Sequence, residues 1–220
     1  VLGVDGCPGG WIGARVSGRS VEWLLLPDAE ALLAAAASCA ATGVDMPIGL
    51  PAVGPRRCDV LARSLLGARR SSVFPAPVRA VLGAGSYAEA CALSRTASGK
   101  ALSVQAWNLV PRIADLDAAL PDGGLPWLSE MHPELSFLRM TGVALPSKKT
   151  PEGRDARVAA LTGWLPDLRL SEIPPPARTE DALDAVAVAW SARRWLSGEA
   201  EILPDPYEVD DRGLPMRIIC

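Results

Sequence analysis

The sequence has no hydrophobic run long enough to cross a membrane. Its most apolar stretch, residues 29–41, is shorter than the ~20 residues that a membrane helix needs, and it contains Glu30. A basic segment followed by an apolar run and a small-residue cleavage site is also missing, because the chain opens on the strand-like Val1-Leu2-Gly3-Val4. We therefore expect a cytoplasmic protein without a membrane partner.

Cysteine and histidine are both scarce, which argues against a disulfide-bonded protein and against a zinc-binding protein. The five cysteines are widely spaced and contain no C-x-x-C pair, so the pattern favours neither a disulfide framework nor a zinc cage. His132 is the only histidine. We interpret the cysteines as reduced thiols.

Short alternating patterns at the start of the chain predict an α/β fold. Glycine-containing turns separate three strand-like runs, which would form an antiparallel meander: residues 1–5, 11–17 and 21–26. Asp28 is placed to cap a helix that runs to about residue 41, and a short strand follows at 44–46.

The remaining pattern predicts one domain that carries a helical insertion. A length of 220 residues suits a single α/β domain over 1–220. Helical spacing dominates residues 51–122, the expected insertion, where Ser86 and Glu89 form a capping-box pattern. Further elements are expected after it: a strand at 127–131, a helix at 151–161 and a last helix from the N-cap Thr179 to the C′ residue Gly198.

Positive charge is concentrated in one part of the chain. Residues 52–100 hold eight Lys and Arg against Asp59 and Glu89, a local balance of +6, so the rest of the chain sums to -9 within the net charge of -3. An enzyme that acts on a phosphate-bearing polymer could use such a segment. A solvated helical face explains the segment equally well.

Five acidic residues, which are the candidate catalytic residues, fall where strands end or where the last helix begins: Asp5, Asp45, Glu130, Asp181 and Asp184. Unpaired buried charges are costly, so acids within apolar strand runs need an explanation, and coordination of a metal ion is one. Asp5 and Asp45 would reach a common ion if the first and fourth strands were neighbours, about 4.8 Å apart. Asp181 and Asp184 are spaced i, i+3 and share one helix face.

Oxygen ligands without histidine or cysteine favour Mg²⁺ or Mn²⁺ as the cofactor. Each acid also has a structural explanation. Asp5 and Asp45 could begin turns, and Asp181 could favour the helix dipole. The spacing does not decide whether Glu130 or Glu134 faces the site.

Two pairs of basic residues are candidate contacts to substrate phosphates. Lys148 and Lys149 precede a helix N-terminus at Pro151. Arg69 and Arg70 precede a proline-containing segment and could hold a phosphate backbone. A solvated surface explains either pair about as well.

Six segments resemble successive signatures of one family: GVDGCPGGWIGA, GVDMPIGLP, ARSLLGARRSSVFPAPVRA, QAWNLVPRIADLD, SEMHPELSF and EDALDAVAVAWSARR. From residue 1 to about 198 the chain is similar to the family catalogued as domain of unknown function 429, described as predicted RNase-H-like nucleases. The resemblance implies a mixed five-stranded sheet, with three antiparallel strands and then parallel strands, and helices on both faces.

The resemblance also implies a site. In RNase H and the RuvC-type Holliday-junction resolvases, an acid on the first strand, an acid at the end of the fourth and an acidic pair opening the last helix bind two metal ions. The positions that match are Asp5, Asp45, Asp181 and Asp184.

These observations lead to the hypothesis of a metal-dependent nuclease that hydrolyses phosphodiester bonds of nucleic acid at a two-metal carboxylate site. Two alternatives stay open: a nucleotide-binding ATPase or kinase-like protein of related fold, and a non-catalytic binding protein. One domain of 220 residues argues against the nucleotide-binding alternative, because that architecture needs two such domains around a cleft. The sequence does not predict the oligomeric state.

Overall fold

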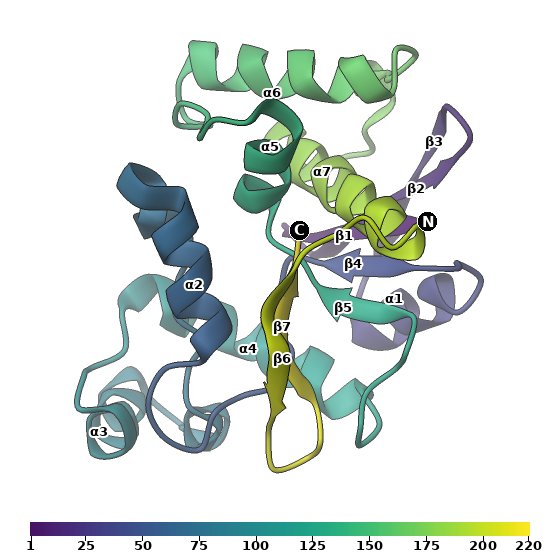
Figure 1. The fold of residues 1–220 in the computed structure, drawn as a ribbon. Coiled ribbons are helices and arrows are strands. Elements are labelled where there is room, and N and C mark those ends of the chain that lie inside the picture. Colours follow the sequence, from purple (N-terminus) through teal and green to yellow (C-terminus); the bar gives the residue numbers. More distant parts are fainter. The chain divides into compact units, whose positions relative to one another are not determined.

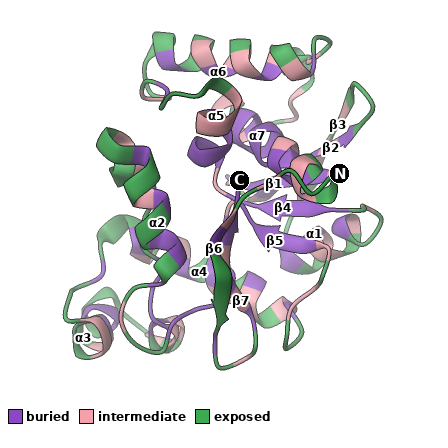
Figure 2. Cartoon of the chain, viewed as in Figure 1, coloured by how far each residue is buried: buried purple, intermediate pink, exposed green.

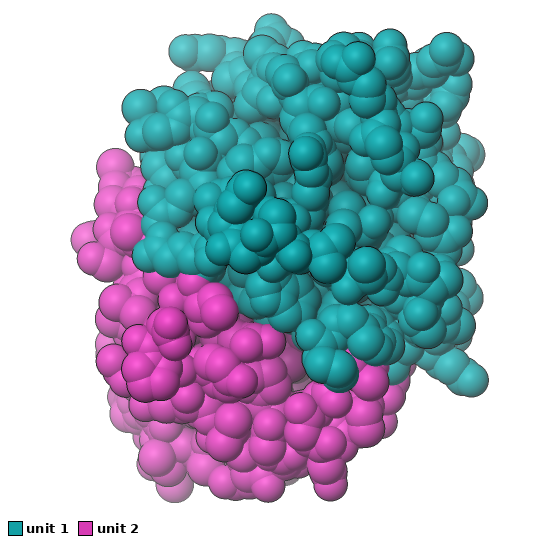
Figure 3. Space-filling view, turned by 45° about the vertical axis from the view of Figure 1, so that its right-hand side comes forward, with its two compact units in different colours: residues 1–46, 126–201, 219–220 teal, residues 47–125, 202–218 magenta.

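The computed structural model of residues 1–220 divides into two compact units, which Figure 3 shows in different colours. A mixed five-stranded sheet forms the centre of the first unit. The first unit contains residues 1–46, 126–201 and 219–220, and the second contains residues 47–125 and 202–218. The helical insertion predicted at about 51–122 falls within the second unit.

The strand order of the sheet is β3-β2-β1-β4-β5. The strands are β1 (Leu2–Cys7), β2 (Gly10–Ser17), β3 (Ser20–Leu26), β4 (Thr42–Val44) and β5 (Leu128–Glu130). The first three pair antiparallel, whereas β4 pairs parallel with β1 and with β5. This order confirms the predicted fold class, although β4 begins two residues before the predicted strand 44–46.

Helices cover both faces of this sheet (Figure 1). The last helix, α7 (Thr179–Leu196), packs on β1, β2 and β4. On the opposite face, Arg15 donates from Nη2 to the carbonyl of Ala35 in α1 (Ala29–Ala36), at 3.4 Å. Asp28 caps α1 as predicted, because its carboxylate accepts from the amide of Ala31 at 2.8 Å.

Two paired glycines let α7 lie directly on the sheet. Gly3 of β1 pairs with Gly43 of β4. A Cβ atom on Gly3 would lie 2.1 Å from the carbonyl oxygen of Ala185 and 2.2 Å from the amide nitrogen of Ala189, both in α7. The side of β1 and β4 that carries Gly3 and Gly43 therefore faces α7, and no larger residue fits at Gly3.

The α7 face holds the core of the first unit, seen as buried strands and a buried last helix in Figure 2. Its members from β2 and α7 include Ile12, Ala14, Val16, Ala182, Leu183 and Val186. Full burial of one aliphatic side chain contributes about 1.5–3 kcal/mol. This apolar layer fixes the register of the sheet, because a one-residue slip would turn it to the other face.

Two shorter helices of the first unit lie against α7. In α5 (Pro133–Thr141), His132 is the N-cap and its ring Nδ1 accepts from the amide of Glu134 at 3.2 Å. In α6 (Pro151–Trp164), Thr150 is the N-cap. A 3₁₀ turn, η3 (Leu170–Glu172), follows α6. The N-cap of α7 is Arg178, one residue before the predicted Thr179, and Gly198 follows the C-cap with φ of +75°.

The second unit is mostly helical. Its helical elements are α2 (Arg57–Leu66), η1 (Gly67–Ser72), η2 (Arg79–Gly83), α3 (Tyr87–Ser98) and α4 (Val104–Ala119). The strands β6 (Ile202–Val209) and β7 (Pro215–Ile219) form a two-stranded sheet, which the sequence did not predict. No helix of the chain is long and apolar enough to span a membrane.

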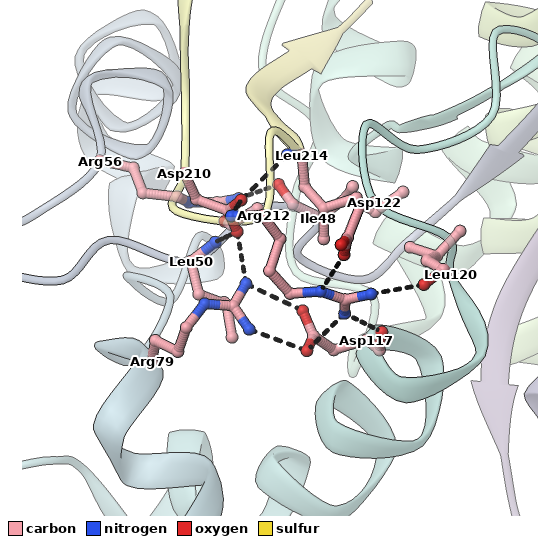
Figure 4. Close-up of polar contacts among 11 residues, drawn as sticks. Ile48, Leu50, Arg56, Arg79, Asp117, Leu120, Asp122, Asp210, Arg212 and Leu214 are labelled. Atoms are coloured by element: carbon pink, nitrogen blue, oxygen red, sulfur yellow. Dashed lines mark hydrogen bonds and ion pairs between the residues drawn. The ribbon is translucent and has the colours of Figure 1, made fainter.

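An ion-pair network ties together the second unit (Figure 4). The buried Asp210 accepts from the amides of Leu50 and Leu214, each at 2.9 Å, and pairs with Arg79. Asp117 pairs with Arg79 at 2.9 Å and with Arg212 at 3.0 Å. Burial alone would raise the pKa of Asp210, but the hydrogen bonds from Leu50, Arg79 and Leu214 lower it. The network thereby joins a loop, a helix and the C-terminal hairpin.

Candidate functional site

The sheet register places Asp5 and Asp45 beside each other on the α7 face. Each residue lies two positions after a glycine of the pair Gly3 and Gly43, and side chains two apart on a strand share a face. The hydrogen bonding between β1 and β4 continues past the end of β4, because the amide of Asp45 donates to the carbonyl of Val4 at 2.9 Å. The predicted neighbourhood of the first and fourth strands is therefore confirmed.

Asp184 joins these two residues from α7. It lies one residue before Ala185, the residue whose carbonyl meets the face of Gly3, and its side chain is buried. Burial raises the pKa of Asp5 well above its usual value, and repulsion by Asp45 and Asp184 raises it further. Three elements thus bring three acids into one place.

The pKa values of the other two acids show the same crowding. Burial raises the pKa of Asp45 to about 7, and repulsion by Glu134 adds to the rise while Lys148 opposes it. Burial raises the pKa of Asp184 to about 6, with further repulsion from Asp45 and Glu134. Such carboxylates are stable in the ionised form only beside a cation.

One cation at this site is Lys148, from the loop between α5 and α6. Its ammonium group donates to Oδ2 of Asp184. Burial acts to lower the pKa of Lys148, but attraction by Asp184, Asp5 and Asp45 raises it overall. Lys148 therefore stays positively charged among the carboxylates, whereas the sequence predicted it as a surface contact to phosphate.

The acids do not form a preformed metal-binding site. No three His, Cys, Asp or Glu side chains are placed together so that they could hold a metal ion. Lys148 gives a physical reason, because its ammonium takes the Asp184 oxygen that an ion would use. The donor set still suits Mg²⁺ or Mn²⁺, since it consists of hard carboxylate oxygens whose mutual repulsion a cation would relieve. A single ion shared by Asp5, Asp45 and Asp184 stays a prediction.

Asp181 lies at the edge of the site and caps its own helix. Its carboxylate accepts from the amide of Arg178 at 3.4 Å, the contact expected of a capping residue. Burial raises the pKa of Asp181, and Asp181 in turn raises that of Asp5. The residue thus caps α7 and adds negative charge beside Asp5.

Glu130 faces away from the carboxylates, although the sequence analysis named it as catalytic. It pairs with Val44, the residue between Gly43 and Asp45, and therefore shares the face opposite to α7. The next residue, Met131, points to α7, because its sulfur would lie 2.4 Å from a Cβ on Gly43. The acid beside the site is Glu134, which raises the pKa of Asp45 and of Asp184.

Arg157 is a buried residue that the sequence analysis missed. Its Nη2 atom donates to Oε1 of Glu134 at 2.5 Å, and its Nη1 atom donates to the carbonyls of Pro146 and Gly153 at 2.7 and 2.8 Å. It thereby neutralises Glu134 and holds the loop that carries Lys148. An arginine at an apolar position of the α6 helical pattern was the only signal for this role.

The basic segment 52–100 carries less available charge than its sequence indicates. The guanidinium of Arg56 is buried, with a bidentate pair to Asp59, and Arg79 belongs to the ion-pair network of the second unit. Among the predicted substrate contacts, Arg70 and Lys149 are exposed, while Arg69 is half-buried. Only some of the positive charges in residues 52–100 are therefore available to a substrate.

Comparison with known proteins gives one match. No curated protein and no solved structure matches the chain. A family model described as "Protein of unknown function (DUF429)" matches residues 3–209, a range that contains Asp5, Asp45, Asp184 and Lys148. The chain therefore belongs to this family, DUF429.

Proposed function

We propose that the chain is a metal-dependent nuclease that hydrolyses phosphodiester bonds of nucleic acid. The observation that supports this function is the convergence of Asp5, Asp45 and Asp184 on one side of the sheet, where each has a raised pKa. Several buried acids that repel one another have a high free energy without a cation, so a structural role alone does not explain them.

Asp5 and Asp45 would hold the ion, with Asp184 beside them. A bound Mg²⁺ or Mn²⁺ supplies an activated water and positive charge at the phosphate. The neighbouring Lys148 holds its charged ammonium where it can attract a phosphate oxygen. Arg157 keeps Lys148 in place by fixing the carbonyl of Pro146.

A nucleic acid substrate is supported by two exposed cations of the chain, Arg70 and Lys149, and by the half-buried Arg69. Phosphate esters repel an acidic site, so positive charge elsewhere on the protein must offset that repulsion. Arg69, Arg70 and Lys149 are the proposed contacts to the phosphate backbone.

The test of this function is a cleavage assay on purified protein. With Mg²⁺ or Mn²⁺, we expect the wild type to cleave at least one member of a panel of single-stranded, duplex and branched DNA and RNA. Asp5→Asn should lower the rate about 100-fold or more, because it removes a proposed ligand of the ion.

Glu130→Gln is the matched control, because Glu130 is also a buried acid of the sheet but faces away from the site. It should retain the wild-type rate within about threefold, a change of less than 1 kcal/mol in the barrier. Hydrolysis of a free nucleotide without cleavage of any nucleic acid would favour the nucleotide-binding alternative. Equal loss in both variants would contradict the assignment of the site.

A further inference from the structure

We infer that a pocket in the second unit binds a small aliphatic anion, a molecule with a hydrocarbon body and one carboxylate or phosphate head group. The pocket is lined only by residues between 54 and 106, all in the unit coloured magenta in Figure 3. The acids Asp5, Asp45 and Asp184 belong to the first unit. The inference therefore goes beyond the proposed nuclease activity and does not depend on it.

The pocket has the size and the walls of a small-molecule site. Its volume is about 310 Å³, within the range of about 300–1,000 Å³ that is typical of ligand pockets. Its walls consist mostly of alanine, proline, valine and leucine. No aromatic side chain lines it, so a nucleobase would have no ring to stack on. An aliphatic body therefore suits the pocket better than an aromatic one.

Hydrogen bonds hold the walls of the pocket in place without a ligand. The amide of Gly54 donates to the carbonyl of Ala97 in α3 at 3.1 Å. The amide of Ala76 donates to Oδ2 of the buried Asp59 at 2.9 Å. The three prolines of the lining add stiffness, because the proline ring fixes φ. A pocket that is formed in advance loses little conformational entropy when a ligand binds.

The oxygen acceptors on one side of the pocket are already used within the chain. The carbonyl of Lys100 accepts from the hydroxyl of Ser94 at 2.7 Å, and the hydroxyl of Ser98 donates to the carbonyl of Ser94 at 2.8 Å. The carbonyl of Leu102 accepts from the hydroxyl of Tyr87 at 2.8 Å. A ligand whose head group only donates hydrogen bonds would therefore lack partners on this side.

Two side chains of the lining remain as donors. Lys100 is the only charged residue that lines the pocket, and it is exposed and makes no ion pair with an acid. The hydroxyl oxygen of Ser103 accepts from the amide of Ala106 at 3.1 Å, which leaves its proton to donate. An ammonium group and a hydroxyl donor match an anionic head group. The apolar walls beside them match a hydrocarbon body.

The test measures binding of octanoate to the full chain at pH 8 by calorimetry. We expect octanoate to bind about tenfold or more tightly than octanol, which has the same body and a neutral head group, because hydrogen bonds to charged groups are the stronger ones. Acetate should not bind measurably at the same concentrations, because it lacks the aliphatic body. Octyl phosphate distinguishes the two head groups, since the tighter of the two anions identifies the one that the pocket prefers.

Variants locate the binding in this pocket. Lys100→Met removes the ammonium group and should weaken octanoate binding about tenfold, while octanol binding changes less than about threefold. Arg95→Met is the matched control, because it removes another exposed positive charge of α3 that does not line the pocket, and it should bind both probes like the wild type. Ala106→Leu should fill the pocket and abolish binding of both probes. If it does not fold, Ala101→Leu makes the same test at an exposed position of the lining.

Three results would overturn the inference. The first is octanoate binding that is no tighter than octanol binding, or that Lys100→Met leaves unchanged or Arg95→Met lowers equally. The second is no binding of octanoate or octyl phosphate at millimolar concentrations. The third is tighter binding of AMP than of either aliphatic anion, because the preferred body would then be aromatic. Each of these results would leave the nuclease proposal standing, since its test uses Asp5→Asn and cleavage of nucleic acid.

Discussion

Asp45→Asn is expected to stabilise the protein in the absence of divalent ions at pH 8. Burial, and then repulsion by Glu134, raise the pKa of Asp45 from 3.8 to about 7. The folded state therefore binds more protons than the unfolded state between about pH 4 and 7, and the wild type loses stability as the pH rises through this window. Asparagine keeps the shape of the side chain and does not titrate.

The expected gain is on the order of 2–4 kcal/mol at pH 8 and close to zero at pH 4, because each pKa unit corresponds to about 1.4 kcal/mol. Urea unfolding in the presence of a chelator at both pH values measures it. Asp155→Asn, which changes an exposed acid of α6, serves as the control and should alter the stability little at either pH. If Asp45→Asn were less stable than the wild type at pH 8, repulsion among the acids would not destabilise the ion-free protein.

Gly3→Ala is expected to destabilise the fold by about 3 kcal/mol or more. The added Cβ would overlap the carbonyl oxygen of Ala185 and the amide nitrogen of Ala189. Both atoms belong to the backbone of α7, so no side-chain rotation relieves the overlap and the helix must move away from β1. Asp184 would move with it, away from Asp5.

The matched control is Gly163→Ala, another glycine to alanine change. Gly163 lies in α6 with open space around its Cβ position, so alanine should stabilise the helix by up to about 1 kcal/mol. Thermal or urea unfolding of the two variants gives the comparison. If Gly3→Ala had the stability of the wild type, α7 would not lie on β1 as described.

The succession of the first strands and the first helix along the chain could be predicted from the sequence because it follows from local signals, whereas the pairing of β4 with β1 was implied by the family resemblance. Glycine-containing turns separate β1, β2 and β3, and Asp28 marks the start of α1 by an ordinary capping contact. The hairpin of β6 and β7 was missed for an equally local reason. Pro204 and Pro206 lie inside β6, and proline argues against a strand.

Part of the candidate site could be predicted as well. Asp5, Asp45 and Asp184 were found because acids are costly within apolar strand or helix patterns. The choice between Glu130 and Glu134 could not be made, because it depends on the register of β5 against β4 and on the start of α5. Alternation along a strand fixes a face only after the partner strand is known.

The role of Lys148 could not be predicted from the sequence, for a different reason. Its position depends on contacts of Arg157 and Gly153 with the preceding loop, which are set by the packing of α6 beside α5 and α7. The sequence shows only two lysines before a helix, a pattern that a solvated surface shares. Long-range packing therefore decided between a surface lysine and one among the acids.

The most direct test of the metal site is a crystal structure grown with Mn²⁺ at pH 8, with the ion located by anomalous scattering. We expect one peak within about 2.0–2.6 Å of carboxylate oxygens of both Asp5 and Asp45. A fully saturated crystal without a peak at these residues, or a separation of more than about 10 Å between the two carboxylates, far beyond the reach of such bonds, would contradict it.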